Sequence, residues 1–296
     1  MKKILFIIVL FSLLFSTVNS AAVKVVNLQT NKNYETINSE TTNFYAVVVG
    51  IEEFAGIEHS GEEYLDESAT AFYEKLISFQ NWKSENVKFL LNENATKDKI
   101  HDAIVNWLDE KENEDDIVLI YYADHGWRIP LLQRMKGHAY VFTYNATSTV
   151  FDEDKISDKE FDSWIDELDS KHITLILDHC YSGRMLALRQ LGRTILAAGG
   201  KYLLCPCNWS DELKSSIFTY FLLQGMDGVA DLSNDGWITP TELFHYVRWP
   251  VFWYSAWYNF PYIFKYDIPF VGPQLPYMYN WHIGSIPLFQ YRNATV

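Results

Sequence analysis

The sequence predicts an α/β protein built on a mostly parallel sheet, and three observations support that class. Short segments that are apolar throughout alternate with segments that repeat apolar residues at helical spacing. Strands without polar alternation are buried on both faces, which is typical of parallel sheets covered by helices. The chain of 296 residues is 48% hydrophobic and 21% charged, so it has enough apolar residues for a substantial core.

The expected elements follow one another along the chain with no linker that would divide it. Strands are expected at 44–51, 86–91, 116–123, 172–180 and 201–205, and helices at 68–79, 94–111, 158–169, 185–191, 215–226 and 240–249. Thr96 is the expected N-cap of the second helix. We therefore expect a single domain over residues 44–248, preceded by a polar extension at 21–43.

The N-terminus has the pattern of a secretory signal peptide. Two lysines precede the apolar run ILFIIVLFSLLF, and the small and polar residues STVNSAA follow it. The run is shorter than the roughly 18 residues that a spanning helix needs. The expectation is cleavage after Ser20 and a secreted or otherwise extracytoplasmic protein without a stable membrane span.

Net charge and cysteine content disfavour a nucleic-acid-binding protein and a disulfide-rich protein. The net charge of −14 disfavours binding to nucleic acid or anionic membranes and favours a basic partner or substrate. With only Cys180, Cys205 and Cys207, the chain cannot form a disulfide framework, and at least one thiol stays free. Nothing in the sequence predicts an oligomeric state.

The C-terminal region, residues 249–296, is expected to be an aromatic-rich extension packed on the same domain. In Trp249–Phe270, 11 of 22 residues are aromatic, and Pro250 and Pro261 interrupt the run. An aromatic flap over one edge of the sheet is the favoured interpretation, and an interfacial contact with a membrane is the alternative.

Two expected strands end in reactive residues. The third runs into YYADHG and places His125 where the chain leaves the sheet, and the fourth runs into LDHCYSG and does the same for Cys180. Ligands meet open parallel sheets at the carboxyl ends of the strands. If the two strands are neighbours, the imidazole and the thiol face each other, as a cysteine nucleophile and its base require.

Neighbouring groups have expected roles as well. The amides of Gly126 and Cys180 could stabilise a tetrahedral oxyanion. His179 precedes the thiol, but successive strand residues point to opposite faces, so it should point away. Gly126 and Gly183 are expected to open the turns after the two strands.

Taken in order, several segments resemble the caspase-fold cysteine peptidases, most of all the metacaspase-like members. The segments that carry the resemblance are YAVVVGI, NVKFLL, DIVLIYYADHG, ITLILDHCYSG and GVADLSNDGWITPTEL, within residues 44–246. The resemblance implies a caspase-like three-layer α/β/α sandwich and a Cys–His dyad endopeptidase. In it His125 is the base, Cys180 is the nucleophile, and the chemistry requires no cofactor.

The motifs depart from the family pattern at two positions. Asp124 replaces the usual glycine before the histidine, as is common in the related legumain family, and Tyr181 follows the cysteine in place of histidine. Metacaspase-like specificity for arginine or lysine would use Asp178, two residues before Cys180. A second family acid would fall at Ser68, so the basic-residue pocket lacks one acid of the family pattern, and legumain-like cleavage after asparagine is the alternative.

The segment DLSNDGWITPTE fits a twelve-residue calcium loop, although a capping box between Thr239 and Glu242 explains it as well. The candidate ligands are Asp231, Ser233, Asp235, the Trp237 carbonyl and Glu242.

A cysteine endopeptidase acting on polypeptides is the leading interpretation of the function. A catalytically weak caspase-fold binding module and a calcium-binding surface protein are the rivals.

Overall fold

In a computed structural model, the described residues are 42–56, 64–125, 139–147, 153–199, 209–265, 273–282 and 286–291, all within one compact unit, Tyr34–Val296. The predicted signal peptide lies outside this part of the chain, as do Gly126, Cys205 and Cys207.

A six-stranded sheet forms the centre of the unit, in the order β11-β7-β6-β3-β1-β2. Its strands are β1 (Phe44–Gly50), β2 (Val87–Leu91), β3 (Ile117–Ala123), β6 (His172–Asp178), β7 (Arg193–Ala197) and β11 (Tyr277–Asn280). Every pairing is parallel except the one between β11 and β7. The prediction of a mostly parallel sheet is confirmed.

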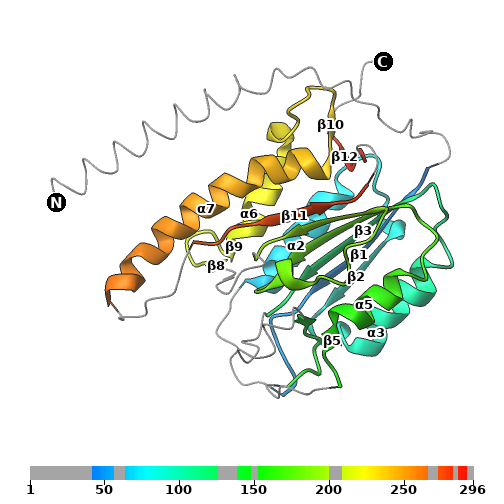
Figure 1. Ribbon diagram of the computed structural model, residues 1–296, viewed down its shortest axis with the longest axis horizontal. Coiled ribbons are helices and arrows are strands. Elements are labelled where there is room, and N and C mark those ends of the chain that lie inside the picture. The colour runs from blue at the N-terminus through cyan, green and yellow to red at the C-terminus, as the bar shows by residue number, and fades with distance from the viewer. Residues whose placement is uncertain are drawn as a thin grey trace. The chain divides into compact units, whose positions relative to one another are not determined.

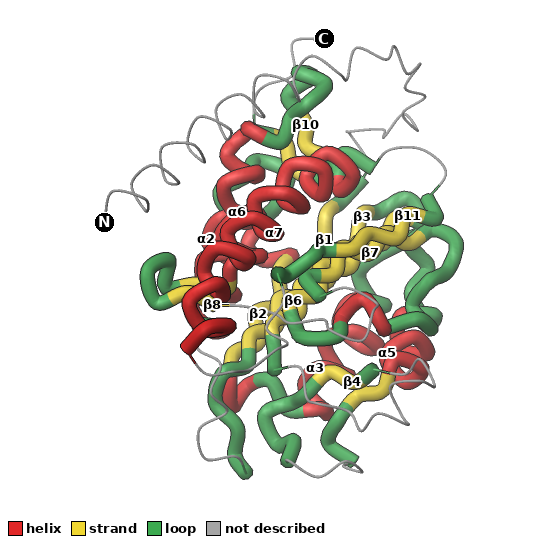
Figure 2. Tube along the Cα trace, turned by 60° about the vertical axis from the view of Figure 1, so that its left-hand side comes forward, coloured by secondary structure: helices red, strands yellow, loops and turns green. Residues whose placement is uncertain are grey.

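Helices cover both faces of the sheet, as Figures 1 and 2 show. One layer contains α2 (Leu65–Ile77), α6 (Ile217–Gln224) and α7 (Pro240–Lys265), and the other contains α3 (Lys97–His101), η3 (Asp102–Leu108) and α5 (Asp158–Ile165). Each layer encloses its own apolar cluster, because alternate residues of the buried strands point to opposite faces. The three-layer α/β/α sandwich is thus confirmed.

Short elements connect these layers. The two-residue strands pair as β4 (Tyr140–Val141) with β5 (Ile156–Ser157), β8 (Trp209–Ser210) with β9 (Ser215–Ser216), and β10 (Trp237–Ile238) with β12 (Phe289–Gln290). Single turns of helix are η1 (Ser84–Asn86), η2 (Asn92–Asn94), η4 (Ser182–Arg184) and η5 (Gly225–Val229). The predicted cap of α3 is present, since Thr96 Oγ1 accepts a hydrogen bond from the Lys99 amide at 3.4 Å.

One element prediction was wrong near residue 190, and one strand there was not predicted. Residues 185–191 do not form a helix, and the fifth strand of the sheet is Arg193–Ala197. Arg189 lies 3.2 Å from the centre of the Tyr279 ring and donates to the Gly183 carbonyl, so it draws the segment toward β11. The strand expected at 201–205 lies outside the described residues.

The aromatic segment continues a helix instead of forming a flap. Helix α7 runs from Pro240 to Lys265, across the boundary that we expected after residue 248. Val247, Val251 and Ser255 recur every fourth residue on its buried side, and this packing holds the helix together through Pro250. None of the described helices is long and apolar enough to cross a bilayer.

Close packing of α2 on β1 depends on Gly50. A Cβ at this position would lie 2.3 Å from Ala69 Cβ and 3.0 Å from Leu91 Cδ1. We expect Gly50→Ala to lower the free energy of unfolding by about 1–3 kcal/mol, measured by urea denaturation, because an extra methyl overpacks the core. Gly56→Ala is the matched control, since its nearest neighbour would be Thr147 Cγ2 at 3.4 Å. Equal losses in both variants would contradict this account.

Candidate active site

The two predicted reacting residues lie beyond the carboxyl ends of adjacent strands. β3 and β6 pair in parallel from Ile117↔His172 to Ala123↔Asp178. The Asp124 amide continues the ladder by donating to the Asp178 carbonyl at 3.4 Å. His125 and Cys180 each stand two residues after the last pair, so their backbones reach the same sheet edge at matching positions.

The two side chains differ in exposure. Cys180 is partly exposed, whereas only 7% of the His125 surface is exposed. The His125 ring packs edge-on against Phe54, with ring centres 5.1 Å apart, and Phe54 in turn contacts Phe142. This apolar wall restricts the orientation of the imidazole and excludes water from one side of it.

The chain turns sharply immediately after Cys180. Tyr181 adopts the left-handed conformation with φ of 64°, which is uncommon for a residue with a side chain. The following turn η4 is anchored because the Gly183 amide donates to the Gly199 carbonyl and the Gly199 amide donates to Ser182 Oγ, both at 2.9 Å. From the sequence we expected Gly183 to open this turn, but the residue with the left-handed conformation is Tyr181.

The side chain of His179 contacts the same turn. It is fully buried, and its Nδ1 lies 3.0 Å from the Cys180 carbonyl and 3.9 Å from Asp124 Oδ1. Burial lowers the pKa of His179 to about 4, so the ring is neutral at pH 7 and the contact with Asp124 is no ion pair. Asp124 instead accepts a hydrogen bond from the Phe142 amide at 2.5 Å. His179 is thus buried beyond the end of β6, and its orientation away from the thiol stays a prediction.

Asp178 and Ser68 converge on one short segment, β9. The Asp178 carboxylate is fully buried and accepts hydrogen bonds from Ser216 Oγ and, at 2.6 Å, from Thr219 Oγ1. Ser68 Oγ lies 3.1 Å from Ser215 Oγ and accepts from the Ser216 amide at 2.9 Å. These bonds tie β6, α2 and the start of α6 together at the sheet edge, and the substrate-binding role of both residues stays a prediction.

Sequence reasoning missed the serine and threonine partners of Asp178. Ser216 is the N-cap of α6 and accepts from the Thr219 amide at 3.0 Å. A serine directly before an apolar run of helical length indicates such a cap. Nothing in the sequence indicates that the capped helix reaches β6.

Three carboxylates gather where β1 and α2 meet. Glu52, Asp66 and Glu67 bring oxygen atoms within 4.8 Å of one another, and Glu52 accepts from the Leu65 amide at the start of α2 at 2.9 Å. Burial opposes the charge of Asp66, yet hydrogen bonds from Glu67, Glu52 and Asn92 lower its pKa overall. The hydrogen bond with Asp66, followed by burial, raises the pKa of Glu67 to about 7.

This shift predicts a dependence of stability on pH. A raised pKa means that the folded chain binds the proton more tightly than the unfolded chain does. The stabilisation from Glu67 is therefore fully present below its ordinary pKa of 4.5 and is lost as the pH rises to about 7. We expect Glu67→Gln to reduce the fall in melting temperature between about pH 5 and pH 8, measured by circular dichroism. Glu74→Gln on the same helix is the control, and an unchanged profile in Glu67→Gln would contradict the assignment.

The candidate calcium loop forms a network of internal hydrogen bonds. Thr239 and Glu242 make the capping box of α7, with Thr239 Oγ1 donating to Glu242 Oε2 at 2.8 Å and the Glu242 amide donating back at 3.2 Å. Asp231 accepts from the Gly236 amide at 3.0 Å and from the Tyr291 hydroxyl at 2.8 Å.

The remaining candidate ligands join this network. Ser233 donates through its amide to Glu242 at 3.0 Å, and Asp235 accepts from the Trp237 amide at 3.0 Å. Among the described residues, the carboxylates of this loop do not form a group of three like that at Glu52. The contacts fit the capping interpretation, and calcium binding stays a prediction.

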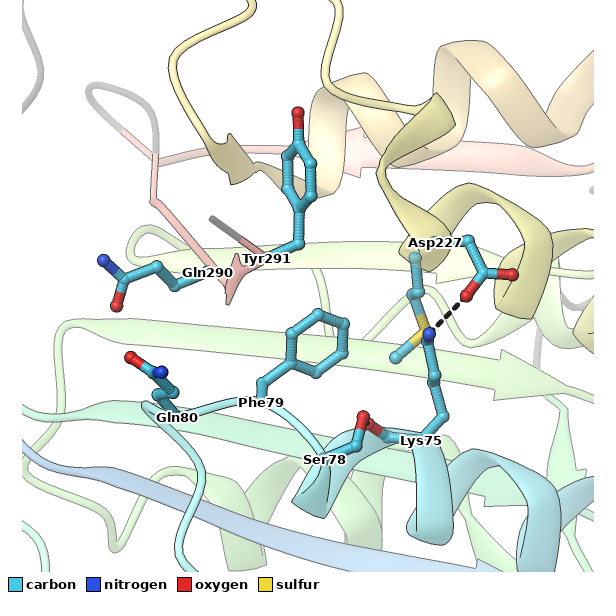
Figure 3. A pocket seen from close by; sticks show the side chains of 8 residues that line it. Lys75, Ser78, Phe79, Gln80, Asp227, Gln290 and Tyr291 are labelled. Carbon is cyan, nitrogen blue, oxygen red and sulfur yellow. Dashed lines mark hydrogen bonds and ion pairs between the residues drawn. The ribbon is translucent and has the colours of Figure 1, made fainter. Parts of the chain in front are cut away.

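A cavity of about 300 Å³ lies at the other end of α2, between that helix, η5 and β12 (Figure 3). Lys75 and Asp227 form an ion pair on one side of it, and Phe79 and Tyr291 line it beside them. It contains none of the predicted site residues, so it is separate from the sheet edge that carries Cys180.

Comparison with known proteins agrees with the fold. Residues 62–189 match the family model of the metacaspase, peptidase C14 domain, a range that includes His125 and Cys180. This region of the chain is thus similar to the peptidase domain of the metacaspases, which have the caspase fold.

A crystal structure of a protein from Geobacter sulfurreducens, determined as a structural-genomics target, is similar with a TM-score of 0.56 at 12% sequence identity. The similarity covers 86% of this chain and 99% of that one and concerns the fold alone. No curated protein matches the chain significantly.

Proposed function

We propose that the protein is a cysteine endopeptidase in which His125 activates Cys180. The observation that carries this proposal is the register of β3 and β6, whose ends bring the two residues to matching positions on one sheet edge. The partly exposed thiol and the nearly buried imidazole have the accessibility that a nucleophile and its base need.

The reaction would follow the two-step course of acyl transfer. His125 takes the thiol proton, and the Cys180 thiolate adds to the substrate carbonyl, with the oxyanion facing the amides of Cys180 and Gly126. The C–N bond then breaks, and His125 gives the proton to the leaving amine. Water, deprotonated by the same imidazole, hydrolyses the acyl-enzyme and restores the thiol.

Surrounding residues hold this arrangement without taking part in bond making. Phe54 limits rotation of the His125 ring, and Tyr181 turns the chain away so that the thiol remains accessible. His179 fixes the Cys180 carbonyl through its 3.0 Å contact. In this proposal these contacts position the reacting groups before substrate arrives, which would lower the entropic part of the barrier.

Cleavage after arginine or lysine is the favoured specificity. Asp178 lies two residues before Cys180, the three carboxylates at Glu52 lie beyond the end of β1, and the chain carries a net charge of −14. An acidic field of this kind attracts basic substrates. Cleavage after asparagine is the alternative, favoured by the legumain-like Asp124. Export through the signal peptide at 1–20 completes the proposal.

The test uses the reduced protein with fluorogenic peptides that differ only in the residue before the cut. Turnover that is highest after arginine or lysine and absent from Cys180→Ala would support the proposal. Highest turnover after asparagine would favour the legumain-like alternative. No cleavage of any peptide, even after limited proteolysis, would favour the rival function of a binding module.

A further inference from the structure

Three tryptophans form an exposed row along α7. Trp249, Trp253 and Trp257 are 51%, 45% and 53% exposed, among the most exposed large apolar side chains of the described residues. They recur every fourth residue and so lie on successive turns of one helix face. We call these three residues the tryptophan row.

The opposite face of the same helix is fixed to the protein. Val251 and Ser255 are fully buried, and each lies two residues, or about 200°, from members of the row. The Gln274 amide donates to Ser255 Oγ at 2.8 Å, and the Gln274 side chain donates to the Ala198 carbonyl beyond β7. The helix is therefore held against the domain with its tryptophans outward.

The charge pattern of this face is unusual for a chain with so many acids. No charged residue occurs from Trp249 to Asn259, although the whole chain has 38 acids. Arg248 stands just before the row, with its guanidinium 5.2 Å from the Trp249 ring. The stretch from Trp249 to Asn259 is thus neutral and aromatic, and the Arg248 cation precedes it.

We propose that the tryptophan row docks α7 on the surface of a zwitterionic phospholipid bilayer. Indole rings combine an apolar body with a polar N–H and concentrate where hydrocarbon meets headgroups. A helix lying in that plane buries one face only, which agrees with the absence of a membrane-spanning helix among the described residues. The net charge of −14 would oppose an anionic surface, whereas a neutral one exerts no such repulsion.

The exposed area of the tryptophan row favours a lipid surface over a second copy of the chain as its partner. A tryptophan side chain offers up to about 250 Å², so three half-exposed rings supply roughly 375 Å². A stable protein interface needs about 800 Å² from each partner. A bilayer has no such minimum, because each ring partitions into the interface independently.

The experiment measures co-flotation of residues 21–296, the chain without its predicted signal peptide, with phosphatidylcholine vesicles and with vesicles rich in phosphatidylserine. The test variant carries Trp249→Gln, Trp253→Gln and Trp257→Gln. The matched control is Trp281→Gln, because Trp281 is 54% exposed but lies outside α7. We expect the triple variant to bind phosphatidylcholine vesicles at least about tenfold more weakly and the control within about twofold of the parent.

Three outcomes would overturn the proposal. The first is that the parent protein binds no vesicles, and the second is that it binds only those rich in phosphatidylserine. The third, equal binding by the triple variant and the parent, would indicate that another apolar segment contacts the bilayer. A concentration-dependent dimer that the triple variant abolishes would identify a second copy as the occupant. Circular dichroism verifies the fold, and turnover of a soluble peptide should be the same in all variants, so this test is independent of the proposed peptidase function.

Discussion

Cys180→Ala is expected to abolish peptide hydrolysis, a loss of roughly 10³-fold or more in kcat, while the protein stays folded. The residue is partly exposed and lies outside the two apolar clusters, so loss of its sulfur leaves the core packing unchanged. His125→Ala should cause a similar loss of activity because it removes the base. The double variant should be no worse than either single variant, since the two groups act as one unit.

Two measurements check this prediction: the rate of cleavage of a fluorogenic peptide, and the free energy of unfolding in urea. Cys180→Ser is the conservative variant, and it should retain the fold with little activity because a hydroxyl is a much weaker nucleophile at neutral pH. Unchanged turnover in Cys180→Ala would refute the dyad. Lost turnover accompanied by unfolding would instead assign Cys180 a structural role.

Asp178→Ala is expected to destabilise the protein by about 2–4 kcal/mol, because it leaves buried hydroxyls without their acceptor. Those hydroxyls belong to Ser216 and Thr219, which begin α6 beside the sheet edge. Thr174→Val is the control on the same strand. Its hydroxyl is buried with no hydrogen-bond partner among the described residues, so its removal should be nearly neutral.

A second substitution of Asp178 tests specificity. If the carboxylate recognises a basic side chain, Asp178→Asn should reduce kcat/KM for peptides cut after arginine or lysine by about 100-fold, the value of a charge-assisted contact. Peptides with a neutral residue at that position should lose much less. An equal loss for all peptides would mean that Asp178 only supports the sheet edge.

Much of the fold follows from local patterns that tertiary contacts do not override. β1 and β3 are apolar throughout and β6 is buried over nearly its whole length, which is typical of strands in the middle of a covered sheet. Thr96 and the capping box at Thr239 fix helix starts through contacts within one turn. The conformation of residues 185–191 depends on long-range packing, because Arg189 contacts Tyr279, which is distant in sequence.

In the candidate site as well, some features follow from the sequence and others depend on tertiary contacts. Motifs at two strand ends were enough to single out His125 and Cys180, because parallel strands end at a common edge. The left-handed Tyr181, the burial of His179 and the convergence of Asp178 and Ser68 on β9 needed the tertiary structure. A sequence carries no signal for a contact between residues whose nearness arises only when α6 packs beside β6.

The amino-acid sequence by itself determined the α/β class, the parallel strands and the two residues proposed for catalysis, since each depends on periodicity or on position along one strand. Only the tertiary structure decided the strand order, the partners of Asp178, and the continuation of α7 through its prolines. These features depend on which distant surfaces bury one another. That choice is made by the free energy of the whole packed chain and not by any local pattern.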